Sequence, residues 1–356
     1  MTKYLYKSIE RLENQDETMP KWYRPKIDSK LLKELSKRSN GPAWINTILY
    51  YGLLFLSGIL AYLSWGTWWA IPAFFIYGTI FAFNASRWHE YGHRSVFKTR
   101  GLNDFFYEIC SFLACMESVQ WRWSHTHHHS RTIHVGIDYE GNADRPPKLF
   151  NLFFLDMFGI RFIYYVLKDL SYHSLGILSQ AAKDYVPEAY HSKMMRNARL
   201  YLLFIIFLIC ISFAVGSFLP LMFFVLPNLY GRTLLQLIIL LQHDGLKANT
   251  WDHRESTRTV HLNFIYGYLL YFNMQYHVEH HIFPQVSFNK LPALHKAIKD
   301  QLPPAKNGLI DGLIEVIPAI IKQSNKILAD CVQSKCKLTD EEMTNIPRVV
   351  YNDTDS

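Results

Sequence analysis

The chain has 356 residues, of which 49% are hydrophobic and 15% aromatic, and it carries a net charge of +7. This composition excludes a disordered chain and a fibrous repeat. The charges are distributed unevenly, because residues 43–86 contain no Asp, Glu, Lys or Arg and residues 200–242 contain only Arg232.

These two charge-free blocks predict membrane spans. Each is about twice as long as the roughly 20 residues that one membrane-spanning helix needs. Each also has a break near its middle, at residues 64–67 and 216–220. We therefore predict two helical hairpins, with spans near 44–65, 68–86, 200–219 and 221–242. The alternative is a buried helix pair in a large soluble core.

Four spans would place the three polar parts of the chain on one side of the membrane. These parts hold nearly all the Lys and Arg, so the positive-inside rule predicts that both termini and the active site are cytosolic. We expect a multi-pass protein of the bacterial inner membrane. Its predicted parts are an N-terminal segment (1–42), a membrane domain with a cytosolic cap (43–300) and a C-terminal helix and tail (301–356). The basic charge fits an anionic lipid surface and does not call for nucleic acid.

Several segments of the polar parts also predict helices. Residues 103–119, 149–169 and 260–276 mix apolar side chains with a few charges, which is typical of helices at a membrane interface. Residues 308–322 carry an apolar stripe with helical spacing, which predicts a helix packed on the cytosolic domain. The five Cys show no metal-binding spacing, and the tail after about residue 326 is polar.

The histidines point to the chemistry. Eight of the 16 His form three tight clusters, and their members are spaced i, i+3 and i+4, which places each cluster on one helical face. Imidazole suits Fe, Zn, Cu and Ni, and eight ligands exceed what one ion uses, so we predict two ions. His127 lies off the face of its cluster. The eight candidate ligands are His89, His93, His125, His128, His129, His277, His280 and His281.

The first cluster permits another interpretation. Residues 89–93 read His-Glu-Tyr-Gly-His, which matches the H-E-x-x-H motif of zinc proteases, in which the Glu acts as general base. An intramembrane zinc metalloprotease would use this cluster alone and leave the other two without a role. We therefore expect Glu90 to orient a metal ligand instead of acting as a base.

The three clusters, with one charge-free hairpin before the first and another between the second and third, resemble the membrane fatty acid desaturase and hydroxylase superfamily. Residues 273–284 (NMQYHVEHHIFP) and Asp252-His253-Arg254 are similar to the bacterial branch of dihydrorhizobitoxine desaturase and rhizopine oxygenase-like proteins. The resemblance implies an all-α integral membrane fold with four transmembrane helices under a cytosolic helical cap. It also implies a non-haem diiron site, dioxygen as cosubstrate and electrons from an external donor.

The function we expect is oxygen-dependent desaturation or hydroxylation of an aliphatic C–H group, in a fatty acyl chain of lipid metabolism. Three residues separate His89 from His93, where acyl-CoA desaturases usually have four, which argues against an acyl-CoA substrate. The alternatives are a hydroxylase or oxygenase of a small non-lipid metabolite and a non-enzymatic membrane metal-binding protein. The chain has no haem-binding, dinucleotide or iron–sulfur motif, so we expect a ferredoxin or cytochrome b5 type of donor.

Family members often recruit one further His after the fourth span. Two residues are candidates: His243 at the end of that span, and His253, which ends an N-x-x-x-H pattern ten residues farther on. We predict His243, because a ligand must be held rigidly at the depth of the site. Besides Glu90, we expect Asp244 and Glu279 to hold metal ligands from behind.

The remaining polar and aromatic residues give weaker signals. Arg232 would face a bundle interior, a substrate or the interface. Trp121, Arg122 and Trp123 would line a pocket or simply pack. Asp138, Asp144 and Arg145 would bind a head group or partner, although a solvated loop is the simplest interpretation of residues 130–148. The last group is predicted to be structural: His134, His173, His191, His261 and His295.

Overall fold

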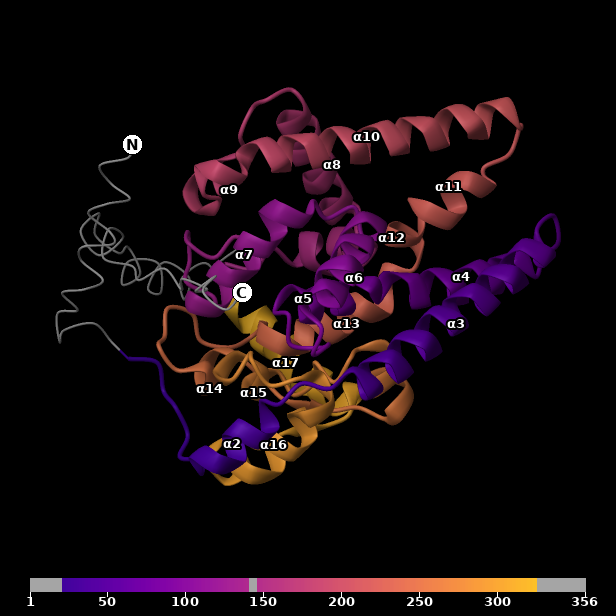
Figure 1. Cartoon of the computed structure of the whole chain (residues 1–356). Coiled ribbons are helices and arrows are strands. Elements are labelled where there is room, and N and C mark those ends of the chain that lie inside the picture. Colours follow the sequence, from indigo (N-terminus) through magenta and orange to yellow (C-terminus); the bar gives the residue numbers. More distant parts are fainter. Residues whose placement is uncertain (1–20, 141–145, 325–356) are drawn as a thin grey trace.

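The computed structural model describes residues 21–140 and 146–324. Asp144, Arg145, Cys331, Cys336 and the predicted tail lie outside the described residues. Two pairs of helices, α3 with α4 and α10 with α11, extend in the same direction from a body of shorter helices (Figure 1). The body contains the histidine clusters, so the fold separates apolar arms from a histidine-bearing part.

The first arm is the predicted hairpin. Helix α3 runs over Asn40–Ser64 and α4 over Ala70–Ala82, and Gly66 adopts a positive φ of 83° in the turn between them. Large apolar side chains on this arm are exposed in the isolated chain, including Phe55 at 69% and Leu63 at 71%. Helix α4 alone is only about 20 Å long. It is followed directly by α5 (Asn84–Gly92), so the arm leads straight into the first histidine cluster.

The second arm differs from the prediction. Helix α10 covers His191–Ala214 and follows the short η2 (Glu188–Tyr190), but the predicted span 221–242 is divided into α11 (Leu219–Phe224), α12 (Pro227–Tyr230) and α13 (Arg232–His243). Pro227 begins α12, and Gly231 packs so tightly on α4 that an added Cβ would lie 2.0 Å from the main chain of Gly78. This close approach bends the chain against α4.

Two helical stretches of the described chain, Asn40–Ser64 and Glu188–Ala214, are long and apolar enough to cross a membrane, and in each only 28% of the most apolar window is buried. A core helix of a soluble protein would be mostly buried, so the low burial argues against the soluble alternative. The predicted four crossings stay a prediction, because α4 and α11–α13 do not form helices of that length.

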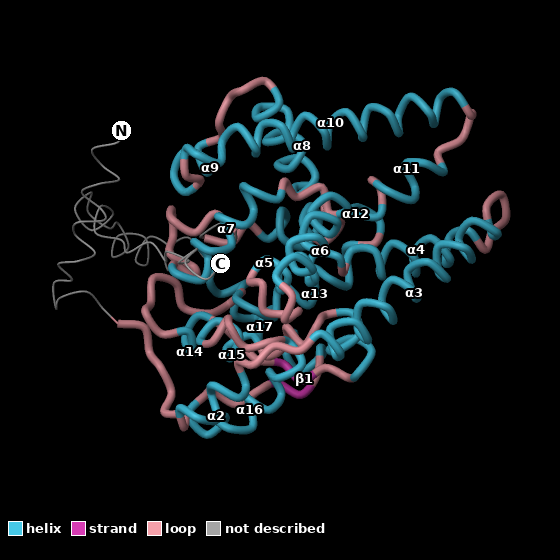
Figure 2. The backbone as a smooth tube through the Cα atoms, in the orientation of Figure 1, coloured by secondary structure: helices cyan, strands magenta, loops and turns pink. Residues whose placement is uncertain are grey.

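The body is built from short helices and one small strand pair (Figure 2). The chain is thus mostly helical, as predicted. Strand β1 (Val260–His261) pairs in parallel with β2 (Lys306–Asn307). The remaining elements are α2 (Ser29–Leu35), α6 (Arg100–Leu113), α7 (Ser118–Ser130), the π-helix η1 (Asn151–Asp156), α8 (Ile160–Ser174), α9 (Gln180–Tyr185), α14 (His253–Ser256), the π-helix η3 (Phe264–Leu270), α15 (His277–Ile282), η4 (Phe288–Lys290), α16 (Leu291–Ile298), η5 (Lys299–Gln301) and α17 (Leu309–Gln323).

Helix α17 confirms the predicted helix over 308–322. It buries Val316 and Ile320 in a cluster with Leu240 and Leu241 of α13. An ion pair of 2.9 Å between Arg258 and Glu315 adds a polar contact beside this apolar one. The C-terminal part of the described chain therefore supports the helix that ends at His243.

Candidate metal centre

Four helices bring the histidine clusters together. Helix α5 carries His89 and is capped at its C-terminal end by His93, α7 carries the second cluster, α15 carries the third, and α13 ends at His243. The clusters lie near helix ends inside the body, and nearly all their side chains are buried. Nine imidazoles converge in two groups, and within each group the possible ligand atoms lie within 4.8 Å of one another.

We name the first group site A: it comprises His89, His93, His125, His129 and His280. The Nε2 atom of His89 lies 2.7 Å from that of His280 and 3.1 Å from that of His125. The Nε2 atoms of His93 and His125 are 2.9 Å apart. All three histidine clusters (the histidine boxes) thus contribute a nitrogen to the same small volume.

We name the second group site B: it comprises His128, His243, His277 and His281. The Nε2 atom of His243 lies 2.8 Å from that of His277 and 3.2 Å from that of His128. The Nε2 atoms of His277 and His281 are 3.1 Å apart. His243, which belongs to no box, therefore stands at the centre of this group.

The division between the sites follows helical geometry. On an α-helix, residue i+4 is rotated by about 40° from residue i, whereas i+3 is rotated by about 60° the other way. His125 and His129 accordingly point to site A, and His128 between them points to site B. In the third cluster, His277 and His281 point to site B and His280 points to site A. The two H-x-x-H-H motifs thus each serve both sites.

The residues fit metal ions. Two nitrogens bound to one ion at about 2.1 Å and at right angles would be about 3.0 Å apart, which matches the separations in both groups. A metal ligand must also be a neutral imidazole. Burial, together with repulsion from neighbouring histidines, lowers the pKa of seven members: His89, His93, His125, His129, His243, His277 and His281. The groups are therefore compatible with a metal site.

Carboxylates lie behind three of these rings. The Nδ1 of His128 lies 2.8 Å from Oδ2 of Asp138, and the Nδ1 of His125 lies 2.9 Å from Oε1 of Glu140. The Nδ1 of His280 lies 3.0 Å from Oε1 of Glu90. The hydrogen bonds from Asp138 and Glu140 keep the proton on Nδ1 and turn Nε2 toward the metal, whereas the contact of Glu90 with His280 is close without the geometry of a hydrogen bond. Although burial acts to lower the pKa of His128, Asp138 and Glu140 outweigh it and raise the pKa to about 9.

Neutral groups hold three further rings. The Nδ1 of His243 donates to the main-chain oxygen of Ser256 at 2.9 Å. The side chain of Thr132 lies 3.1 Å from Nδ1 of His281, and that of Gln242 lies 3.2 Å from Nδ1 of His277. Both sites are therefore anchored on their outer side by buried polar contacts.

The loop after α7 corrects the sequence analysis. Asp138 was expected in a solvated loop, but its side chain is only 1% exposed and faces His128. Gly136 and Ile133 adopt positive φ values of 81° and 53°, which turn the loop back onto the helix it leaves. Glu140 was missed altogether, because no regular spacing links a loop carboxylate to a helical histidine.

Two residues expected to hold ligands make other contacts. Glu279 is fully buried, where it accepts a hydrogen bond from Thr259 at 2.6 Å and pairs with His295 on α16. Its contacts therefore tie α15 to the strand region and to α16. Asp244 follows α13, and its main-chain oxygen accepts from Arg258 at 3.3 Å.

His253 lies outside both groups. Its ring stacks on Trp22, with ring centroids 3.9 Å apart, and contacts the ring of His281 at 5.0 Å. Burial lowers the pKa of His253 to about 3. His127 contacts the ring of Tyr185, away from both groups.

The remaining candidates make packing and polar contacts. Arg232 faces the interior of the bundle, with its guanidinium 3.8 Å from the ring of Phe162. Trp121 packs against Trp88, Arg122 reaches Asp104 at 3.3 Å and Trp123 packs against Tyr190. The other histidines have partners away from the two sites: His134 with Trp251, His173 with Ser179, His191 with Val186, and His261 with His295.

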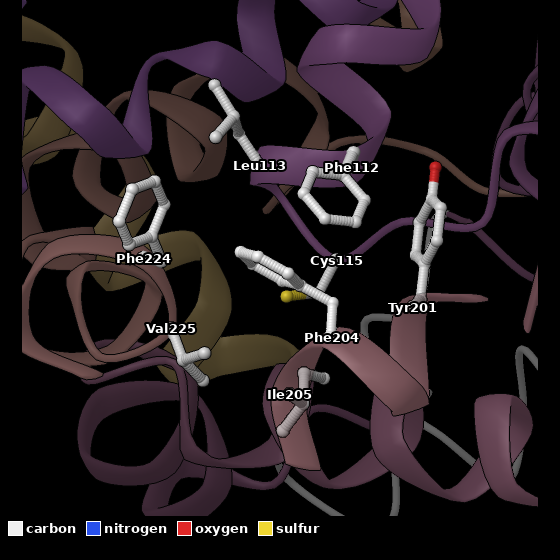
Figure 3. A pocket seen from close by; sticks show the side chains of 8 residues that line it. All are labelled: Phe112, Leu113, Cys115, Tyr201, Phe204, Ile205, Phe224 and Val225. Carbon is white, nitrogen blue, oxygen red and sulfur yellow. The ribbon is translucent and has the colours of Figure 1, made fainter. Parts of the chain in front are cut away.

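A small apolar pocket lies between α6 and the second arm, beside the segment that precedes α7 (Figure 3). Helices α6, α10 and α11 contribute most of its lining, which is aromatic and aliphatic. The lining residues are Phe112, Leu113, Cys115, Tyr201, Phe204, Ile205, Phe224 and Val225. Such a lining suits hydrocarbon and offers no charged group to a polar ligand.

Comparison with known proteins places this geometry in a family. The family model for fatty acid desaturase matches residues 65–311, which include all three boxes and His243. No curated protein matches the chain. Because the matched region is more than half of the chain, the protein belongs to the fatty acid desaturase family. Family membership makes it an oxidoreductase, and together with the two apolar helices it indicates membrane association.

Proposed function

We propose that this member of the fatty acid desaturase family is a membrane-bound, dioxygen-dependent diiron enzyme that desaturates an aliphatic C–H bond in a fatty acyl chain. The observation that carries the proposal is the convergence of nine imidazoles, seven of them buried, in two adjacent groups. One ion does not use nine nitrogens, and imidazole suits iron. The family match gives the same class of chemistry independently.

In this proposal site A and site B each hold one iron. Bound iron would supply the redox chemistry with dioxygen, which no side-chain acid or base supplies for an unactivated C–H bond. The chain's own residues hold and orient the histidine rings that would bind the iron. Asp138 and Glu140 fix the rings of His128 and His125, Glu90 lies against the ring of His280, and burial keeps bulk water from the centre.

Glu90 also bears on the protease alternative. A general base must reach a water at the metal. The side chain of Glu90 is instead fully buried, with one oxygen beside Nδ1 of His280 and the other 3.2 Å from the hydroxyl of Ser95. This geometry favours a positioning role over that of the base in a zinc protease.

A lipid-like substrate is supported by the exposed apolar arms and by the apolar pocket between α6 and the second arm. The alternative, hydroxylation of a small non-lipid metabolite, rests on the resemblance to the bacterial branch and on the three-residue spacing of the first box. We also propose that α4 and α11–α13 complete a four-crossing topology with a cytosolic active site in the bacterial inner membrane. Electrons would come from an external carrier of the ferredoxin or cytochrome b5 type.

The test combines metal and product analysis. Protein purified from iron-sufficient cells should contain two irons per chain, and expressing cells should accumulate a new double bond in an acyl chain. One zinc and no iron would refute the diiron centre. Iron without any altered acyl chain would instead favour the small-metabolite alternative. As a control, His125→Ala and His281→Ala should lose iron while still inserting into the membrane, because both residues lie outside the apolar arms.

A further inference from the structure

A stack of aromatic rings leads from the protein surface to site B. Trp22 is partly exposed and lies parallel to the buried ring of His253, with centroids 3.9 Å apart and an interplanar angle of 5°. His253 in turn contacts the ring of His281, with centroids 5.0 Å apart. His253 is not in either histidine group, so its contacts leave it between the surface and the centre.

The stack is held rigidly. Trp251 packs edge-on against Trp22 at 5.3 Å, and the guanidinium of Arg131 lies 4.5 Å from the ring of Trp251. The main-chain N–H of Tyr23 donates to the main-chain oxygen of Trp251 at 3.2 Å. The extended segment 21–28 is thereby fixed on the loop that leads into α14.

The surface around Trp22 is basic. Lys21, Arg24 and Lys26 are all exposed, and none of them forms an ion pair with a carboxylate in the described part of the chain. The nearest acidic residue along the segment, Asp28, caps α2 by accepting from the N–H of Leu31 at 2.8 Å. Among the residues that the structure describes, this face therefore presents positive charge that no carboxylate pairs with, beside an aromatic ring.

The position of this face argues for a protein partner. Residues 21–28 and α14 lie at the end of the body opposite the tips of the α3–α4 and α10–α11 arms (Figure 1). If the arms enter the membrane, this face points away from lipid. A positive patch on such a face attracts a negatively charged protein and raises its association rate.

We propose that an acidic iron–sulfur carrier protein docks on the face formed by Lys21, Trp22, Arg24 and Trp251 and delivers electrons to site B through Trp22 and His253. The proposal rests on the proposed function. Each docking event transfers one electron: the reduced carrier is oxidised and the ferric centre is reduced, with no bond made or broken in the stack. Two such electrons and two protons from solvent, with two hydrogens from the substrate, reduce dioxygen to two waters.

Docking can be tested without turnover. The double variant Lys21→Glu/Arg24→Glu should weaken binding of a purified acidic [2Fe–2S] ferredoxin by about tenfold at low salt, with a smaller difference at high salt. The matched control Lys98→Glu/Lys183→Glu makes the same charge change at exposed residues elsewhere and should bind normally. Equal weakening by both variants, or by neither, would overturn the docking face. So would weakened binding to phosphatidylglycerol vesicles with unchanged ferredoxin binding.

The route is tested by the rate at which saturating reduced ferredoxin is oxidised in a single turnover. Trp22→Leu should slow this rate several-fold with full iron content, whereas Trp22→Phe, which keeps a ring, should restore most of it. An unchanged rate, or a change in affinity alone, would overturn the route. Dithionite separates this proposal from the function: if dithionite-reduced enzyme forms no product, the function fails, whereas product with dithionite and no effect of the variants refutes the docking face.

Discussion

The loop carboxylates Asp138 and Glu140 allow each of the two metal sites to be weakened separately by mutation. Asp138 is hydrogen-bonded to the site B member His128, and Glu140 is hydrogen-bonded to the site A member His125. Asp138→Asn keeps the size of the side chain but removes the charge that holds Nδ1–H of His128. We therefore expect this change to weaken site B and to spare site A.

The size of the effect follows from the burial of the contact. Loss of a partner that orients a metal-bound histidine typically lowers metal affinity about 10–100-fold, or roughly 1.4–2.7 kcal/mol. The upper half of this range is expected, because the side chain of Asp138 is 1% exposed and water cannot replace it. Its Oδ2 also accepts from the N–H of Ile133 at 2.8 Å, and the remaining oxygen of Asn can retain that bond.

The assay is dialysis against chelators of increasing strength, followed by iron quantitation per chain. Asp138→Asn should pass through a one-iron plateau at a weaker chelator than the unchanged protein. Glu140→Gln is the matched control: it should show a similar plateau, and double-variant protein should lose both irons together. The reasoning would be refuted if Asp138→Asn lost both irons in one step, or if both single variants retained iron like the unchanged protein while their helix content was normal.

Three other predictions follow from the structure. His243→Ala should lower iron content to one per chain while His253→Ala leaves it at two, as iron quantitation would show; the reverse result would make His253 the ligand. Gly231→Ala should lower the free energy of unfolding in detergent by about 1–3 kcal/mol, because its Cβ would collide with Gly78. The control Gly52→Ala has open space around it and should leave the free energy of unfolding unchanged. Metal-free protein should lose thermal stability as the pH falls below about 6.5, because the unfolded chain takes up protons that the seven site histidines with lowered pKa do not take up in the folded state. A melting temperature that stays flat down to about pH 5 would contradict this.

The boxes were predictable because their chemistry is local. Each cluster lies on one helix, so the spacing i, i+3, i+4 already fixes which rings share a face. The same spacing also explains which histidines belong to site A and which to site B, because helical rotation turns His128 and His280 away from their neighbours. The spacing does not predict which helices meet, because this depends on tertiary packing.

The contacts behind the rings were harder to predict for the same physical reason. Asp138 and Glu140 reach α7 only because the loop turns back at residues with positive φ, one of which is Ile133. Glu279 was predicted to hold a ligand from its place within the third box, but a helical side chain one or two residues from a ligand points to another face. It pairs instead with His295 on α16. Similarly, the charge-free block 200–242 predicted apolar helices but not their division, which depends on the packing of Gly231 on Gly78.

The junction between the first arm and the metal centre rests on one buried cation. Arg87 is fully buried two residues before His89, and it donates to the main-chain oxygen of Leu270 at 2.8 Å and to Oδ1 of Asn46 at 2.9 Å. These partners are neutral oxygens on η3 and α3, so Arg87 joins three elements by hydrogen bonds instead of by an ion pair. Arg87→Met would leave those buried acceptors unsatisfied, which costs about 1–3 kcal/mol each.

That cost should appear as a loss of order around His89 and not only as a loss of stability. Arg87→Lys keeps the charge but has fewer donors in a different geometry, so it should recover only part of the effect. We expect both variants to melt earlier and to lose iron first from site A, because α5 carries His89 and His93 follows directly as its C-cap. Iron loss from site B first, or lowered stability with two irons retained, would show that Arg87 supports the fold without positioning the centre.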